Sequence, residues 1–160
     1  MVAGDTRQGG LPDAVMDVVE RFRQGAWGGY LLHPSAADGL CTRASLALIA
    51  QLEPTGCNPK LLRMPLGGTM HAVVAVDDTI IDFTRRQFVS DAPVPTIETR
   101  DELIAALNPT VEPTSFDPDW DLSAVHRGNP QSPLWIPANW RDLLRDADPP
   151  GVSPEWPPRS

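Results

Sequence analysis

Three residues, Cys41, His71 and Asp82, have the types and the order that nucleophilic attack on an acyl group requires. Cys41 follows Asp38-Gly39 at the start of a segment with helical apolar spacing. The unpaired N–H groups and the positive end of the dipole at a helix N-terminus stabilise a thiolate, which is the nucleophilic form of cysteine. A base and a residue that orients the base complete such a site. We therefore expect Cys41 as nucleophile, His71 as base and Asp82 as the orienting residue.

The spacing of His71 and Asp82 predicts that the two side chains meet. They lie in two β-rich runs, Met70–Val76 and Thr79–Phe83, which only Asp77-Asp78 separates. If these two aspartates form the whole turn, the last residue of the first run pairs with the first residue of the second. Side chains alternate along a strand, so the histidine and the aspartate share a face as diagonal neighbours. An unpaired carboxylate among apolar residues is costly, which also predicts a partner for Asp82.

Each of these residues also has a plainer interpretation. A free cysteine is often a small buried core residue, so Cys41 can be structural. A lone histidine such as His71 is often a satisfied structural group, and Asp82 can lie on a solvated face of the sheet. Under these interpretations the chain is a non-catalytic interaction module, in which a Pro- and Trp-rich C-terminal segment binds the partner. Reactivity of Cys41 separates the two hypotheses.

The remaining histidines and the second cysteine predict less. His33 precedes a proline in a loop and is the alternative base, whereas His126 has the surroundings of a surface loop. Cys57 lies in a Gly-Cys-Asn-Pro turn and is interpreted as incidental. These residues do not have the spacing of a zinc site, and no phosphate-binding glycine motif is present. We expect neither a metal nor a cofactor.

The elements that must position these residues can be predicted from periodicity and from turn residues. Helices are expected at Pro12–Gln24, at about Leu40–Leu52, at Arg100–Leu107 after a Thr99–Glu102 capping box, and near Asn139–Arg145. A strand is expected at Lys60–Leu66, before the hairpin. The segment Ala26–Asp38 is expected to be irregular. The predicted fold class is α+β, with the cysteine-bearing helix packed on a small antiparallel sheet.

Composition limits the possible partners and the domain organisation. The chain has 160 residues, a net charge of −8 and 18 prolines that concentrate toward the C-terminus. Such a charge, with no basic run, argues against nucleic acid, and no apolar stretch reaches the roughly 20 residues that span a bilayer. We expect one domain at 1–145 and a poorly ordered, Pro-rich tail at 146–160. No secretory signal precedes the domain, so a cytoplasmic location, with both cysteines reduced, is expected, or delivery without a cleaved signal.

The tryptophans of the C-terminal segments have two interpretations. Either they clamp those segments across the core, which we favour, or they form an aromatic rim for a peptide substrate. The residues concerned are Trp120, Trp135, Trp140 and Trp156.

Short motifs around the three candidate residues resemble the papain-like/transglutaminase-like superfamily of cysteine enzymes. They are especially similar to small bacterial papain-fold toxin domains, some of which are glutamine deamidases. The motifs are Gly39-Leu-Cys41-x-x-x-Ser45-Leu46-x-Leu48, Gly68-x-x-His71-Ala-Val-Val, and Ile80-Ile81-Asp82-Phe83-Thr84 followed by Gln87-Phe88. The resemblance covers about residues 39–88 and includes the order Cys, His, Asp.

This resemblance implies a papain-like fold and a cysteine hydrolase or acyl transferase that acts on a protein or peptide. It favours deamidation of glutamine side chains by a toxin or effector, with a cognate inhibitor or immunity protein as a possible partner; peptidase and transglutaminase activities are the alternatives. Papain-type peptidases place a glutamine shortly before the cysteine for the oxyanion, and this chain has Ser35 and Asp38 there. These two residues, with Trp27 and Gln87, are the candidates for oxyanion or substrate contacts.

Overall fold

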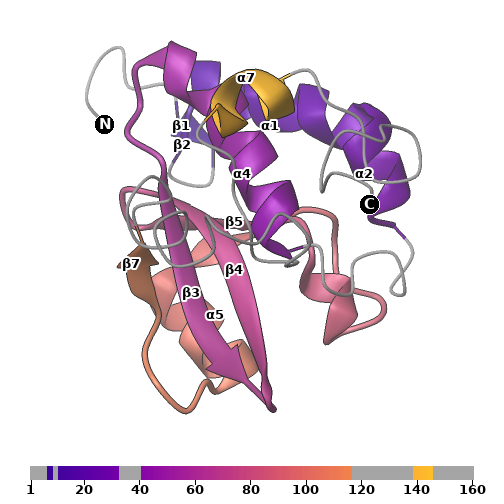
Figure 1. The fold of residues 1–160 in the computed structure, drawn as a ribbon. Helices are drawn as coiled ribbons and strands as arrows, with labels where there is room; N and C mark the ends of the chain where they lie inside the picture. Colours follow the sequence, from indigo (N-terminus) through magenta and orange to yellow (C-terminus); the bar gives the residue numbers. More distant parts are fainter. Residues whose placement is uncertain (1–6, 9–10, 33–40, 117–138, 146–160) are drawn as a thin grey trace.

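The structure is an α+β fold in which helices pack on both faces of an antiparallel sheet (Figure 1). This computed structural model describes residues 7–8, 11–32, 41–116 and 139–145. The helices are α1 (Asp13–Gln24), α2 (Ala26–Tyr30), α4 (Cys41–Leu52), α5 (Arg100–Leu107) and α7 (Trp140–Arg145), with 3-10 turns η1 (Glu53–Thr55) and η2 (Arg85–Gln87). The strands are β1 (Arg7–Gln8), β2 (Leu11–Pro12), β3 (Lys60–Leu66), β4 (Thr69–Val76), β5 (Thr79–Asp82), β6 (Thr96–Thr99) and β7 (Thr114–Phe116).

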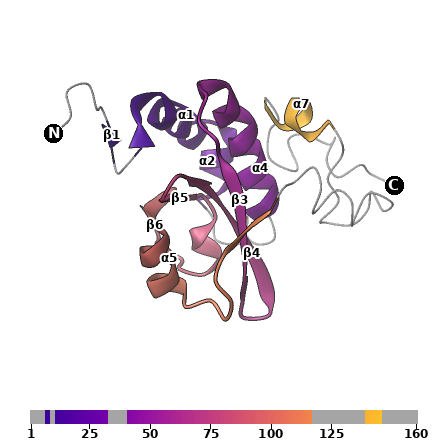
Figure 2. The same cartoon turned by 90° about the vertical axis from the view of Figure 1, so that its left-hand side faces the viewer.

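The main sheet has the strand order β6-β5-β4-β3-β7, and all of its neighbouring strands are antiparallel. Its two faces belong to different apolar clusters because side chains alternate along each strand. Ala72, Val74 and Val76 of β4 join the larger cluster under α1 and α4, whereas Val73 and Ala75 face the smaller cluster with Leu103 of α5. Figure 2 shows α4 and α5 on opposite sides of the strands.

The hairpin of β4 and β5 has the predicted register. Val76 pairs with Thr79 and Val74 pairs with Ile81, so Asp77-Asp78 is a two-residue turn. Asp77 has a φ of 53°, in the left-handed region that tight hairpin turns require. The prediction of an even-numbered turn is therefore confirmed, and with it the shared face of the histidine and the aspartate.

Helix α4 lies along β4 and is buried on nearly all sides. Eleven of its 12 residues are buried, and they include the polar Thr42, Arg43 and Ser45. The Ser45 hydroxyl donates a hydrogen bond to the Ala72 carbonyl at 3.2 Å and so joins the helix to the strand backbone. The predicted helix is confirmed over Cys41–Leu52, and residue 40 lies outside the described residues.

The expectation that residues 26–38 are irregular was wrong for the first five, which form α2. Gly28 makes this helix possible, because a Cβ there would lie 1.7 Å from the Arg23 carbonyl oxygen. The close approach lets the chain turn directly from α1 into α2. It also buries Trp27, whose ring stacks on Phe22 with centroids 6.2 Å apart. Backbone proximity of this kind has no periodic signal in the sequence.

Other predicted elements agree with the structure. Strand β3 has the predicted bounds, and α7 agrees with the helix expected near 139–145. The capping box of α5 is present, with Glu102 N–H donating to Thr99 Oγ1 at 3.1 Å and Thr99 N–H to Glu102 Oε1 at 2.9 Å. Trp140 is completely buried in the larger cluster, as the clamp interpretation predicts. The other three C-terminal tryptophans and the tail at 146–160 lie outside the described residues, so the domain boundary stays a prediction.

Candidate active site

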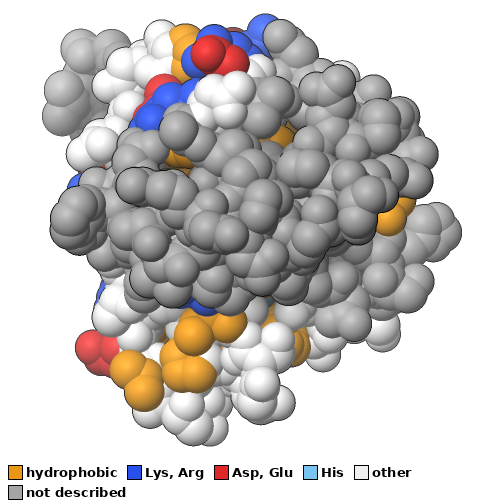
Figure 3. Space-filling model, viewed as in Figure 1, with side chains coloured by type: hydrophobic (Ala, Val, Ile, Leu, Met, Phe, Trp, Pro, Cys, Tyr) orange, Lys and Arg blue, Asp and Glu red, His pale blue; other side chains and the backbone are white. Residues whose placement is uncertain are grey.

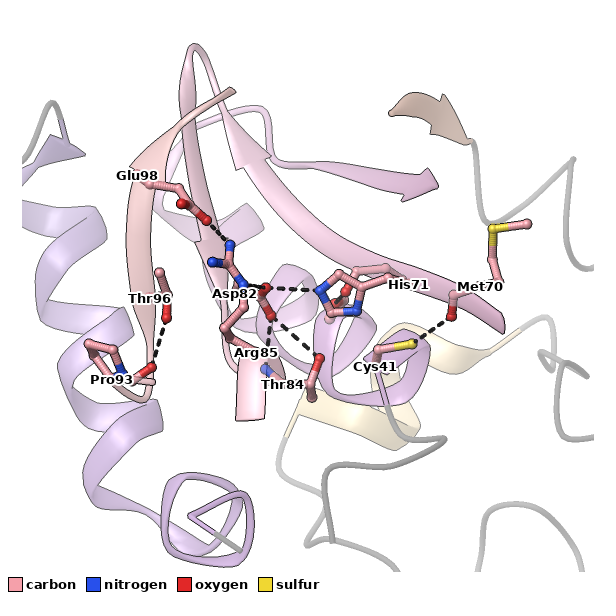
Figure 4. Close-up of polar contacts among 11 residues, drawn as sticks. Cys41, Met70, His71, Asp82, Thr84, Arg85, Pro93, Thr96 and Glu98 are labelled. Atoms are coloured by element: carbon pink, nitrogen blue, oxygen red, sulfur yellow. Dashed lines mark hydrogen bonds and ion pairs between the residues drawn. The ribbon is translucent and has the colours of Figure 1, made fainter. Parts of the chain in front are cut away.

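Cys41 is the first described residue of α4, and its thiol points to the end of β4 that carries His71 (Figure 4). Its side chain is almost fully buried, and Sγ lies 3.4 Å from the Met70 carbonyl oxygen, to which it donates. Met70 directly precedes His71, so this contact and the Ser45 bond one turn later hold the cysteine beside the histidine strand. The helix and the sheet together therefore position the thiol.

His71 and Asp82 form a completely buried pair. Nε2 of the imidazole lies 2.8 Å from Oδ2 of the carboxylate, and neither side chain is exposed to solvent. The imidazole also packs against the ring of Phe88 in a T-shaped arrangement, with centroids 4.8 Å apart. The histidine therefore has one orientation, fixed by a charged group and by an aromatic ring.

The second ring nitrogen of His71 is the one available to a nucleophile. Nε2 faces a carboxylate and so carries a proton, which leaves Nδ1 as the acceptor of the neutral ring. Nδ1 has no hydrogen-bond partner among the described residues. Figure 4 shows Cys41 on the side of the imidazole away from Asp82. The thiol bonds to the Met70 carbonyl in this conformation.

Asp82 receives hydrogen bonds on both of its oxygens. The backbone N–H of Thr84 donates to Oδ1 at 3.0 Å, with its hydroxyl at 3.4 Å. Nε of Arg85 donates to Oδ2 at 3.0 Å, the same oxygen that faces His71. Nη2 of Arg85 pairs in turn with Glu98 Oε2 on β6, and the Arg85 side chain is only 5% exposed. A chain of contacts thus runs from His71 through Asp82 and Arg85 to Glu98, in which cationic and anionic groups alternate.

This network sets the protonation of the pair. Burial lowers the pKa of His71, but the charge and the hydrogen bond of Asp82 outweigh it and Cys41 adds to the rise, so the pKa of His71 is raised from 6.5 to about 9. Burial raises the pKa of Asp82, yet His71, Arg85 and the Thr84 backbone together hold it below its usual value. Both directions favour an imidazolium beside a carboxylate at neutral pH.

A further cation lies on the cysteine side of the sheet. Arg63 of β3 pairs with Ala72 and shares the face of Leu61, which packs under α4. Its side chain is largely buried. Burial lowers the pKa of Arg63, and the charge that Cys41 carries when it is ionised opposes that shift. Sequence reasoning missed Arg63, since an arginine in an apolar strand has no motif that marks it.

Two of the other predicted site residues, Trp27 and Gln87, lie in the described part of the chain. Trp27 is 3% exposed in the core, so its ring has little surface to offer a substrate. Gln87 is half-buried on η2, and its Oε1 is buried with no hydrogen-bond partner among the described residues. Ser35 and Asp38 lie outside the described residues, as do His33 and His126.

Cys57 lies elsewhere, after η1, as a free and partly buried thiol 3.6 Å from the Leu52 carbonyl oxygen. Within the described part of the chain, no group of three His, Cys, Asp or Glu side chains could hold a metal ion. No described helix is long and apolar enough to cross a membrane.

Comparisons with family models, with curated proteins and with solved structures gave no match for this chain.

Proposed function

We propose that the protein is a cysteine-dependent amide hydrolase or acyl transferase, with Cys41 as nucleophile, His71 as general base and acid, and Asp82 as the residue that orients His71. One observation carries the proposal. Nε2 of His71 is held by a buried carboxylate, while Nδ1 faces the side on which the only described thiol of the site lies. This placement supports the roles of nucleophile, base and orienting group for the three residues.

At neutral pH His71 rests as an imidazolium, so the reaction begins once Cys41 has lost its proton and its thiolate lies beside the protonated Nδ1. The thiolate attacks the amide carbon and forms a C–S bond, and the carbonyl oxygen takes the negative charge. When the tetrahedral intermediate collapses, the C–N bond breaks and Nδ1 gives its proton to the leaving amine. Water, deprotonated at Nδ1, then attacks the thioester, and the acid product and the thiol are released. A primary amine in place of water gives transamidation.

The developing oxyanion needs donors, and two sources are proposed. Backbone N–H groups at the start of α4 are one, as at other helix N-termini. The guanidinium of Arg63 is the other, since it lies on the same face of the sheet as α4 and its charge interacts with that of Cys41. The substitution Arg63→Lys should preserve part of the activity, whereas Arg63→Gln should lose more.

The side-chain amide of a protein glutamine is the substrate that we favour. This choice rests on the resemblance of the motifs at Cys41, His71 and Asp82 to papain-fold toxin domains that deamidate, and on the absence of the upstream glutamine that papain-type peptidases use. The same resemblance supports a papain-like fold. It also supports an effector that is delivered to its target cell and restrained by an inhibitor protein.

Intact-mass spectrometry tests the proposal. Casein and other glutamine-rich proteins are incubated with the wild type, with Cys41→Ala and, as the matched control, with Cys57→Ala. A mass increase equal to the exchange of an amide for an acid, present with Cys57→Ala and absent with Cys41→Ala, supports deamidation. If the wild type yields shorter fragments that Cys41→Ala does not yield, the activity is proteolysis and not deamidation. If the substrate instead gains the mass of an added amine, the activity is transamidation. A Cys41 thiol with the same alkylation rate as Cys57 overturns the nucleophile assignment.

A further inference from the structure

A cavity of about 410 Å³ lies beside the candidate site, on the opposite face of the sheet from α4. It is enclosed by the tip of the β3–β4 hairpin, by the residues after η2 and by the end of α5. Its lining residues are Leu66, Gly67, Thr69, Phe88, Val89, Ala106, Leu107, Asn108 and Thr110. This volume is within the range of small-ligand pockets, about 300–1,000 Å³.

Two of the lining residues connect the cavity to the catalytic groups. Phe88 forms part of the wall, and its ring also packs against the His71 imidazole in a T-shaped arrangement, with centroids 4.8 Å apart. Thr69 forms another part, and the next residue, Met70, accepts the hydrogen bond of the Cys41 thiol. The ring of Phe88 therefore lies between the cavity and His71, the proposed base. Thr69 lines the cavity and is the neighbour in sequence of Met70, whose carbonyl accepts from Cys41, the proposed nucleophile.

The lining selects for an uncharged partner. None of the described residues that enclose the cavity carries a charge, although the chain as a whole has a net charge of −8. Two large apolar side chains are exposed here, Val89 of the lining at 41% and, next to the lining residue Thr69, Met70 at 39%. Figure 3 shows apolar side chains at the surface of this end of the molecule, where the hairpin and α5 lie. Exposed apolar groups around a pocket are typical of a binding site.

We propose that this cavity binds an apolar, uncharged side chain of the substrate polypeptide, close in sequence to the residue whose amide is attacked. The inference rests on the proposed function and adds a substrate class to it. The cavity is connected to His71 through Phe88 and to the Met70 end of β4 through Thr69, so a substrate chain that runs along this end of β4 can place a side chain in it. A substrate with an acidic or basic residue at that position is excluded, since no described lining residue offers an opposite charge.

Alkylation of Cys41 by short iodoacetyl peptides tests the cavity without the natural substrate. The probes are iodoacetyl-Gly-amide, iodoacetyl-Phe-amide, iodoacetyl-Gly-Phe-amide and iodoacetyl-Asp-amide, so that two positions of the apolar side chain are tried. Burial of one aromatic side chain predicts at least about a tenfold faster alkylation by the better phenylalanine probe than by the glycine probe. The aspartate probe should be no faster than the glycine probe.

Two variants of α5 make the test specific. Ala106→Trp fills the cavity and should bring the phenylalanine-to-glycine rate ratio close to one, with an unchanged rate for plain iodoacetamide. Ala105→Trp is the matched control, because Ala105 is an exposed neighbour on the same helix that does not line the cavity, and it should keep the wild-type ratio.

The outcomes separate the two proposals. If Cys41 reacts faster than Cys57 with iodoacetamide but both phenylalanine probes give a ratio near one, the cavity proposal is overturned and the proposed function stands. A high ratio that survives Ala106→Trp overturns it as well. Equal iodoacetamide rates at the two cysteines overturn the proposed function, and the substrate cavity falls with it.

Discussion

Oδ2 of Asp82 lies 2.8 Å from Nε2 of His71 inside the protein, so the imidazole is oriented by a charge that water does not reach. The pair is formed by two strands joined by two residues, and Arg85 and Glu98 extend it to the edge strand β6. The folded protein binds the proton of the His71 imidazolium more tightly than the unfolded chain does. Protonation of His71 therefore stabilises the folded state.

The stability of the protein should therefore depend on the protonation of His71. Its pKa is raised from 6.5 to about 9 in the folded state, so the contribution is complete below about pH 6.5 and is lost as the pH rises to about 9. The loss is on the order of 3 kcal/mol in the free energy of unfolding. Urea unfolding of the wild type and of His71→Gln between about pH 6 and 9.5 measures it, since the difference between them should shrink with rising pH. Parallel curves contradict the assignment; repeating the comparison in a Cys41→Ala background removes the titration of the thiol.

Glu98 and Arg85 should shift the titration of His71 in opposite directions. Glu98→Gln removes the charge that compensates Arg85, so the arginine opposes the imidazolium more strongly and the pKa of His71 falls. Arg85→Gln removes the cation next to Asp82, and the pKa of His71 rises. NMR titration of the labelled imidazole measures both. If Arg85 and Glu98 serve only to hold the residues after β5 in place, both substitutions loosen the contact of Asp82 with His71. Both would then lower the pKa of His71, which contradicts the prediction.

The three proposed catalytic groups should act as one unit. Cys41→Ala and His71→Ala are each expected to abolish turnover, and the double variant should be little worse than either single one. Asp82→Asn should retain partial activity, because an amide oxygen still accepts from Nε2 without supplying charge. Rates measured on the substrate identified by mass spectrometry decide this. Multiplicative losses in the double variant mean that the thiol and the imidazole work independently.

Trp140 should be essential for stability although it lies far along the chain from the site. It is completely buried against the cluster under α4, so Trp140→Ala is expected to lower the free energy of unfolding by about 3–5 kcal/mol. Its neighbour Arg141 provides the comparison, since its partly exposed ion pair with Glu53 is worth at most about 1 kcal/mol and its cation–π contact with the Trp140 ring about as much. Chemical denaturation compares Trp140→Ala with Arg141→Ala. Equal losses would show that α7 is held by charge rather than by packing.

Local patterns predicted the parts of the fold that depend on neighbouring residues. The strand at Lys60–Leu66, the two-residue turn and the Thr99–Glu102 capping box are all set by residues within a few positions of one another, and all three are found. The contact of His71 with Asp82 followed from the turn and from strand alternation. Strands β6 and β7 were missed because they are short, partly exposed pieces among prolines, and the partners that define them are distant in sequence.

The rest of the candidate site depends on contacts that no sequence pattern encodes. The acceptor of the Cys41 thiol is the backbone carbonyl of Met70, and every residue has a carbonyl. Glu98 meets Arg85 because β6 pairs with β5, and this pairing brings together residues that lie on different elements. Arg63 faces the α4 side only because β3 lies next to β4. These residues could be found only after the sheet order was known.

The turn at Asp77-Asp78 has a consequence for the changes in chain length that this protein tolerates. Insertion or deletion of one residue there shifts the register by one and turns Asp82 to the opposite face, where Ile81 and Phe83 now pack. The same change would move a charge into the apolar cluster and separate it from the histidine. Changes of two residues restore the alternation. Variants that change the length of this turn by two residues should therefore be functional, and those that change it by one should not. Single substitutions of Asp78, which is exposed and has no positive φ, are accepted much more freely.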